Sequence, residues 1–137
     1  YDIRRKTYLG HTDSFRAILH PARAELYALL PYRVAKVKTH VIGQAHVGKA
    51  LRYQVSVSAR QARLGMHVVH VAVMDPSEKK RVEYARSMLA ANGKASGEIP
   101  LALNDPPGLW KIVATEVASG IHSTALVPVA KPLAVGR

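Results

Sequence analysis

The chain has 137 residues, of which 48% are hydrophobic, and it carries a formal net charge of +11. This length allows one domain with its own core, and the hydrophobic content excludes a disordered tail. The absence of cysteine excludes disulfide bonds and zinc–thiolate sites. No segment is apolar enough to cross a bilayer, and no apolar signal-peptide stretch follows Arg4–Lys6. Because the sequence does not begin with Met, we expect a segment before Tyr1.

A net charge of this size is typical of proteins that bind nucleic acid or another anionic surface. Along the chain, however, most lysines and arginines stand singly or in pairs. The two tight clusters are Arg4–Lys6 and Lys79–Arg81, the second of which is expected in a solvated hairpin turn. This dispersion favours a generally basic surface over a dedicated nucleic-acid interface.

Residues 1–32 are predicted to form a short β segment. Strands are expected over Tyr1–Leu9, Ser14–Leu19 and Ala24–Leu30. Pro21 and Pro31 leave the third stretch too short for a stable helix, although a helix stays the alternative there. The segment is too short for a core of its own. We interpret it as the closing strands of a preceding β domain or as a hairpin added to the domain that follows.

Residues 33–130 show the pattern of a β-sandwich, with turn signals every eight to twelve residues. Seven strands are predicted, over Val34–Val41, Leu51–Val57, His67–Met74, Val82–Leu89, Ala95–Leu103, Leu109–Val117 and Ile121–Val129. A helix stays the alternative for Val82–Ala91. Turns are predicted at Gln61–Gly65, Asp75–Glu78, Ala91–Lys94, Asn104–Gly108 and Ala118–Gly120. Residues 131–137 are expected to be a tail.

Three of these turns carry a resemblance to known modules. One strand ends in Asp75-Pro76, Asn92-Gly93 makes a hairpin turn, and Pro107-Gly108 precedes the strand that holds Trp110. This order resembles the immunoglobulin-like modules of bacterial surface proteins, of alpha-macroglobulin-type proteins and of large glycoside hydrolases. The resemblance implies an all-β fold, an immunoglobulin-like antiparallel β-sandwich of about seven strands preceded by a short β segment. Such modules carry no catalytic residue.

A second resemblance lies in the first 32 residues. Pro21 and Leu26-Tyr27-Ala28-Leu29 look like the last strand of the small C-terminal β domain that follows the catalytic barrel in many glycoside hydrolases. This resemblance implies that the chain could belong to a glycan-active extracellular enzyme whose catalytic part lies upstream.

No constellation of residues points to catalysis or to a cofactor. The nine acidic residues fall mostly in or beside turns, where carboxylates are usually solvated, and no pair stands out. No serine lies in a Gly-x-Ser-x-Gly motif, and Val47–Ala50 lacks the Ser or Thr that ends a P-loop. We therefore predict no catalytic, cofactor-binding or metal-binding residue.

The histidines argue against a metal site. His67 and His70 are three positions apart, so they face opposite sides of a strand. His40 and His46 could meet across a hairpin, but surface or hydrogen-bonded histidines are the more frequent outcome.

Two aromatic residues are predicted in the core. Trp110 shares its face with Ile112 and Ala114, and Tyr53 shares its face with neighbouring valines. Tyr84 could be exposed instead. The candidate contacts for a ligand or partner are therefore the exposed turn and this aromatic residue, namely Lys79, Lys80, Arg81 and Tyr84.

These observations predict a non-catalytic structural or spacer module of a larger secreted or surface protein, one candidate being a glycan-active enzyme. Its expected partners are neighbouring domains of that polypeptide, and its expected location is outside the cytoplasm. A carbohydrate- or protein-binding module is the first alternative, and a basic nucleic-acid-binding domain is the second. An exposed aromatic or apolar patch would favour the first alternative, and one strongly positive face would favour the second.

Overall fold

The structure, a computed structural model, describes residues 1–60, 62–132 and 134. Gln61, at the start of the predicted turn 61–65, therefore lies outside the described residues. The same holds for residues 133 and 135–137 of the predicted tail.

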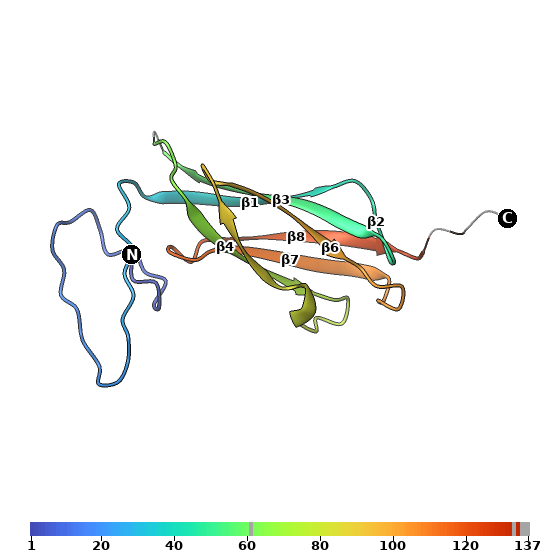
Figure 1. Cartoon of the computed structure of the whole chain (residues 1–137), viewed down its shortest axis with the longest axis horizontal. Coiled ribbons are helices and arrows are strands. Elements are labelled where there is room, and N and C mark those ends of the chain that lie inside the picture. Colours follow the sequence, from blue (N-terminus) through green and yellow to red (C-terminus); the bar gives the residue numbers. More distant parts are fainter. Residues whose placement is uncertain (61, 133, 135–137) are drawn as a thin grey trace.

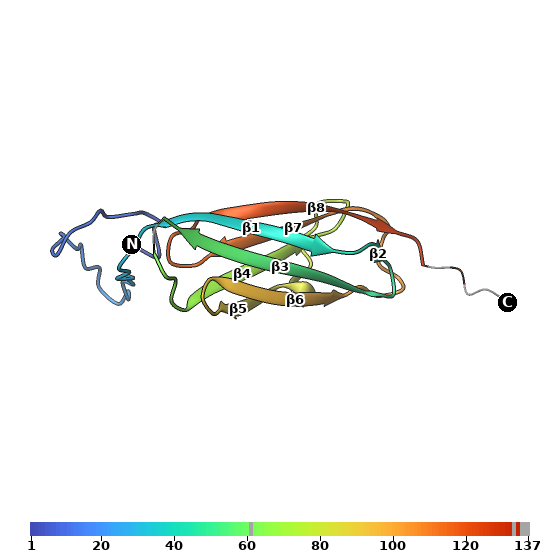
Figure 2. The same ribbon diagram turned by 90° about the horizontal axis from the view of Figure 1, so that it is seen from above.

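Within the described residues, two β-sheets pack face to face (Figures 1 and 2), which confirms the all-β sandwich. Their strands are β1 (Val34–Ile42), β2 (Ala45–His46), β3 (Ala50–Ala59), β4 (His67–Met74), β5 (Arg86–Ala90), β6 (Lys94–Pro100), β7 (Gly108–Glu116) and β8 (His122–Ala130). One sheet has the order β1-β3-β6 and the other the order β2-β8-β7-β4-β5. Seven strands match the predicted ones within a few residues. The two-residue strand β2 was not predicted, and it pairs in parallel with β8, so the sandwich is not purely antiparallel.

Period-two alternation builds the core, because it turns every second side chain of a strand toward the facing sheet. Tyr53 of β3 and Trp110 of β7 are both fully buried, as predicted. In β1, Val34 and Val37 are both buried although they are three residues apart, because the strand register shifts between Val34 and Lys36. The sheets also meet at the β1–β8 edge, where the hydroxyls of Thr39 and Ser123 lie 2.6 Å apart.

The strand predicted over Val82–Leu89 begins later than expected. A short 3-10 helix, η1 (Val82–Tyr84), comes first, and β5 follows it. The helix alternative for this stretch is therefore wrong beyond a single turn. The predicted Asn92-Gly93 turn is confirmed, with positive φ angles of 51° and 75° at its two central residues. Such a pair of angles is typical of a tight type I′ turn, and here it carries the chain from β5 in one sheet to β6 in the other.

Residues 1–33 form an extended loop at one end of the sandwich (Figure 1). The three strands predicted there are wrong as strands, because their β pairing is limited to isolated bridges from Asp2 to Thr7 and to Tyr27. Backbone hydrogen bonds join residues 1–3 to residues 26–28. A lone pair of short strands with no third strand beside it is marginal, which explains why pairing stops there.

The chain enters and leaves the sandwich at opposite ends of its long axis. The loop of residues 1–33 lies at one end, and β8 finishes at the other (Figures 1 and 2). In the part of the chain that the structure describes, no helix reaches the length and apolar character needed to span a membrane.

Candidate functional site

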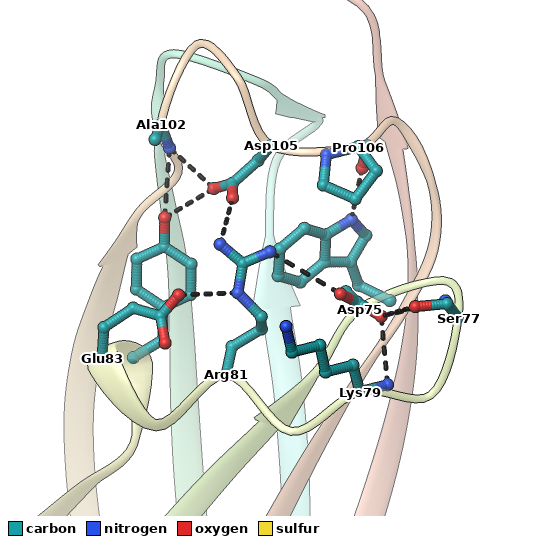
Figure 3. A network of polar contacts seen from close by, with 10 residues as sticks. Asp75, Ser77, Lys79, Arg81, Glu83, Ala102, Asp105 and Pro106 are labelled. Carbon is teal, nitrogen blue, oxygen red and sulfur yellow. Dashed lines mark hydrogen bonds and ion pairs between the residues drawn. The ribbon is translucent and has the colours of Figure 1, made fainter.

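The predicted contact residues lie on the β4–β5 loop, which follows the end of β4 that points away from residues 1–33 (Figure 1). Figure 3 shows the polar contacts of this loop region from close by. The β6–β7 loop packs against the β4–β5 loop there, since Arg81 contacts Asp105 across them. Lys79, Lys80 and Arg81 follow the Asp75 turn, and Tyr84 ends η1. The structure therefore places all four residues in one loop region, but they differ in what surrounds them.

Arg81 is held by three carboxylates. Its Nε donates a hydrogen bond to Glu83 at 2.6 Å, and one terminal nitrogen donates to Asp105 at 2.7 Å. The other terminal nitrogen lies 3.6 Å from Asp75. The hydrogen bond to Glu83, together with the charge of Asp105, raises the pKa of Arg81. The whole edge of the guanidinium is thus engaged within the protein.

Asp75 organises the loop that leads to Arg81. One of its carboxylate oxygens accepts hydrogen bonds from the Ser77 amide at 2.9 Å, the Ser77 hydroxyl at 2.7 Å and the Lys79 amide at 3.1 Å. The hydroxyl bond is the largest of the effects that lower the pKa of this carboxyl. The turn predicted at Asp75–Glu78 is confirmed, and the side chain of Asp75 caps it.

Tyr84 is half-buried rather than exposed. Its hydroxyl donates to Asp105 at 2.5 Å and accepts from the Ala102 amide at 3.2 Å. Burial, followed by the hydrogen bond to Asp105, raises the pKa of this hydroxyl. The guanidinium of Arg81 lies 5.6 Å from the ring centroids of both Tyr84 and Trp110, within the range of a cation–π contact. Trp110 completes the cluster by donating to the Pro106 carbonyl at 2.9 Å.

This arrangement divides the four predicted contacts into two pairs. The polar groups of Arg81 and Tyr84 form hydrogen bonds with Asp105, and these bonds join the two loops. Lys79 and Lys80 are exposed, and neither side chain forms an ion pair within the described residues. Contact between any of the four and a ligand stays a prediction.

A second polar cluster lies at the other end of the sandwich and was not predicted. His67 Nδ1 is 3.2 Å from a Glu116 oxygen, and both side chains are only 1% exposed. Glu116 also accepts hydrogen bonds from the amides of Ala118 and Ser119 and from the Ser119 hydroxyl, at 3.1, 2.7 and 2.5 Å. Burial alone would raise the pKa of Glu116, but these hydrogen bonds outweigh it and lower that pKa.

Tyr32 connects this cluster to the loop of residues 1–33. Its hydroxyl lies 2.8 Å from His67 Nε2 and accepts the Gly65 amide proton at 2.9 Å. A hydroxyl, an imidazole and a carboxylate in series form the arrangement that can move a proton away from the hydroxyl. Here the imidazole and the carboxylate are enclosed by protein. These contacts join Tyr32, near the end of residues 1–33, to β4 and through His67 to Glu116 at the end of β7.

One sequence signal could have located this cluster. Trp110, Ile112, Ala114 and Glu116 share one face of β7 by period-two alternation, so the alternation itself places Glu116 in the interior. The expectation that carboxylates near turns are solvated is wrong for four residues, because Asp2, Asp75, Asp105 and Glu116 are all buried. Each accepts hydrogen bonds from backbone amides, which offset the loss of water.

The histidine predictions have a mixed outcome. His67 points into the core and His70 points outward, so they face opposite sides of β4, as expected. His40 and His46 do not share a hairpin face, because β1 and β2 belong to different sheets. Among the described residues, no three His, Asp or Glu side chains converge in a way that could hold a metal ion.

Among the comparisons with known proteins, the search of solved structures bears on the fold. No family model matches the chain, and no curated protein matches it. Among solved structures, the chain is similar to the β-glucosidase of Listeria innocua in complex with isofagomine, with a TM-score of 0.54 and 15% identity over 95% of this chain. The same enzyme in complex with glucose gives a TM-score of 0.52 and 16% identity over 79% of this chain.

These matches cover only part of the matched β-glucosidase chains. The chain spans 21% and 17% of those two β-glucosidase chains. At this level of identity, the likeness shows a common β-rich fold.

Proposed function

We propose that this chain is a non-catalytic structural module of a larger, glycan-active protein. The observation that carries the proposal is the fold, which resembles about one fifth of each matched β-glucosidase chain. The two polar clusters support it, because their charged groups are occupied in joining loops to one another and to residues 1–33. Immunoglobulin-like character, as in bacterial surface and macroglobulin-type proteins, is part of the same proposal.

The shape of the domain suits a spacer. The chain enters at one end of the sandwich and leaves at the other (Figure 1), so preceding and following domains would be held apart by the length of the strands. The nine residues of β8 span about 30 Å at about 3.3 Å per residue. A stiff two-sheet domain of this length keeps its two neighbouring domains at a more constant distance than an unstructured linker does.

Residues 1–32 are proposed to contact the neighbouring domain, with 33–130 as the sandwich and 131–137 as a linker. The loop of residues 1–33 has large apolar side chains in solvent, and Leu19 and Leu29 are 79% and 86% exposed. Ile18 and Leu26 are more than half exposed beside them in the sequence. Apolar side chains exposed as a group are typical of surfaces that another protein covers.

The proposal is tested on the polypeptide that carries this sequence in its source cells. An antibody to the sandwich should detect, in the cell envelope or the culture medium, a band much larger than 14.9 kDa. A cytoplasmic band at that mass would overturn both the module and its extracytoplasmic location. The isolated chain should not hydrolyse p-nitrophenyl β-glucoside, whereas turnover that survives repurification would refute the non-catalytic role.

A further inference from the structure

Basic residues that are scattered along the sequence gather on one face of the sandwich. The strand register sets Lys38 of β1, Ser56 of β3 and Lys94 of β6 side by side. All three side chains point outward from the three-stranded sheet, because their neighbours along the strands, such as Val37, Val55 and Ala95, face the core. Neighbouring strands lie about 4.8 Å apart, so the backbones of the two lysines are about 10 Å apart. Two long cationic side chains therefore flank a short serine.

This face is hollowed along the central strand. A hollow of about 350 Å³ lies between the two lysines, and a second of about 400 Å³ adjoins it, since Gln54 and Ser96 line both. We call the two together the cationic groove. Its polar and charged lining residues are Lys38, His40, Arg52, Gln54, Ser56, Arg86, Lys94, Ser96 and Glu98.

The positive charge of this face is not balanced locally. Among the described residues of β1, β3 and β6, Glu98 is the one acidic residue on the outer face. Lys36, Lys38, Arg52 and Lys94 form no ion pair within the described part of the chain. Arg52 lies opposite Glu98 in the strand register, whereas Lys38 and Lys94 lie on either side of Ser56. An anion between these two lysines would thus meet cations that form no ion pair within the described residues.

The charge is also uneven over the molecule. The outer face of the five-stranded sheet carries apolar side chains such as Leu109 and Leu126, and its strands place one lysine there, Lys111. That lysine is paired with Glu78. The cationic groove is therefore a local feature and not a sample of an evenly basic surface.

The lining chemistry selects a class of ligand. On the described outer face of β1, β3 and β6 the imidazole of His40 is the one aromatic ring, and the Tyr53 ring that borders the second hollow is fully buried. The groove therefore lacks the row of exposed aromatic rings on which single-stranded nucleic acids stack. Lysines pair with carboxylates or sulfates as point charges. The hydroxyls of Ser56 and Ser96 and the amide of Gln54 can exchange hydrogen bonds with ligand hydroxyls. We propose that the cationic groove binds an acidic polysaccharide, in which charged groups alternate with hydroxyl groups along an extended chain.

The test compares two variants with equal changes in charge. Lys38→Glu/Lys94→Glu reverses the two flanking lysines, and Lys49→Glu/Lys131→Glu reverses two exposed lysines outside the groove. Binding of polygalacturonate, which is carboxylated, of dextran sulfate and of neutral dextran is measured by isothermal titration calorimetry at two salt concentrations. The comparison of the first two polymers shows which anionic group the groove prefers.

We expect the wild-type chain to bind at least one acidic polymer but not dextran, with affinity that falls as salt rises. The groove variant should bind at least about tenfold more weakly, which corresponds to about 1.4 kcal/mol. The control variant should stay within about threefold of the wild type. Lys38→Gln/Lys94→Gln, which removes the charges without reversing them, gives the same comparison if the glutamate variant fails to fold.

Three results would overturn the inference. Equal weakening by the groove and control variants would show attraction to net charge alone. Tighter binding of a 20-residue oligothymidylate than of either acidic polymer would identify the groove as a nucleic-acid surface. Failure to bind any polyanion would show that the groove is not a binding site for acidic polymers. None of these results bears on the module proposal, because the mass and location of the parent polypeptide are measured separately.

Discussion

Replacing Glu116 by glutamine should destabilise the domain without changing its shape. The carboxylate accepts protons from two amides and one hydroxyl and lies beside His67 Nδ1, so four donors converge on it. A glutamine has one carbonyl oxygen, which can serve one pair of these donors, while its NH₂ group faces the other pair. A buried donor without an acceptor costs about 1–3 kcal/mol. Two such donors should lower the free energy of unfolding by about 3 kcal/mol.

Urea unfolding at pH 7 measures this loss directly, and thermal unfolding should show it as a decrease in Tm of about 10 °C for a domain of this size. The matched control is Glu98→Gln, because Glu98 is exposed on the three-stranded sheet. Its effect should remain within about 0.5 kcal/mol. A loss at Glu116 no larger than that of the control would refute the assignment of four buried donors to this carboxylate.

The pH dependence of the same pair of proteins tests the ionisation of Glu116. Hydrogen bonds from Ser119, His67 and Ala118 outweigh the effect of burial, so its pKa lies below the ordinary value in the folded state. A depressed folded-state pKa stabilises the protein fully above the unfolded-state pKa of about 4.3, and this contribution is lost as the pH falls. The stability difference between wild type and Glu116→Gln should be constant from pH 7 to about pH 5 and should shrink below about pH 4. A difference that stays constant down to pH 3 would contradict this reasoning.

Arg81→Met should destabilise the domain by about 2–3 kcal/mol in urea unfolding, because it leaves the buried Asp105 carboxylate without its cation. Adding Asp105→Asn should recover part of that loss, and a double variant as unstable as the sum of the single ones would contradict the coupling. Tyr32→Phe removes the hydroxyl that accepts the Gly65 amide proton, so it should cost about 1 kcal/mol and speed hydrogen exchange of that amide. Unchanged exchange at Gly65 would argue that Tyr32 does not hold the junction.

Much of the sandwich follows from the local sequence. Alternation in β3 and β7 predicts which side chains enter the core, and it places Tyr53 and Trp110 there correctly. Turn chemistry at Asp75 and at Asn92-Gly93 predicts where strands end, because both signals act within four residues. The strands predicted within residues 1–32 are wrong, because a strand needs a pairing partner and the β propensity of a segment does not reveal whether a partner is present.

The two polar clusters and the cationic groove are decided by the tertiary structure. Arg81 meets Asp105 only because the β4–β5 and β6–β7 loops lie together, and Tyr32 meets His67 from 35 residues away. In the sequence, Lys38 and Lys94 are isolated basic residues, and their dispersion indicated an evenly basic surface. Strand register alone sets them on either side of Ser56. Pairing across a sheet joins residues at any sequence separation, so local pattern determines which face a residue occupies, and the fold determines its neighbours.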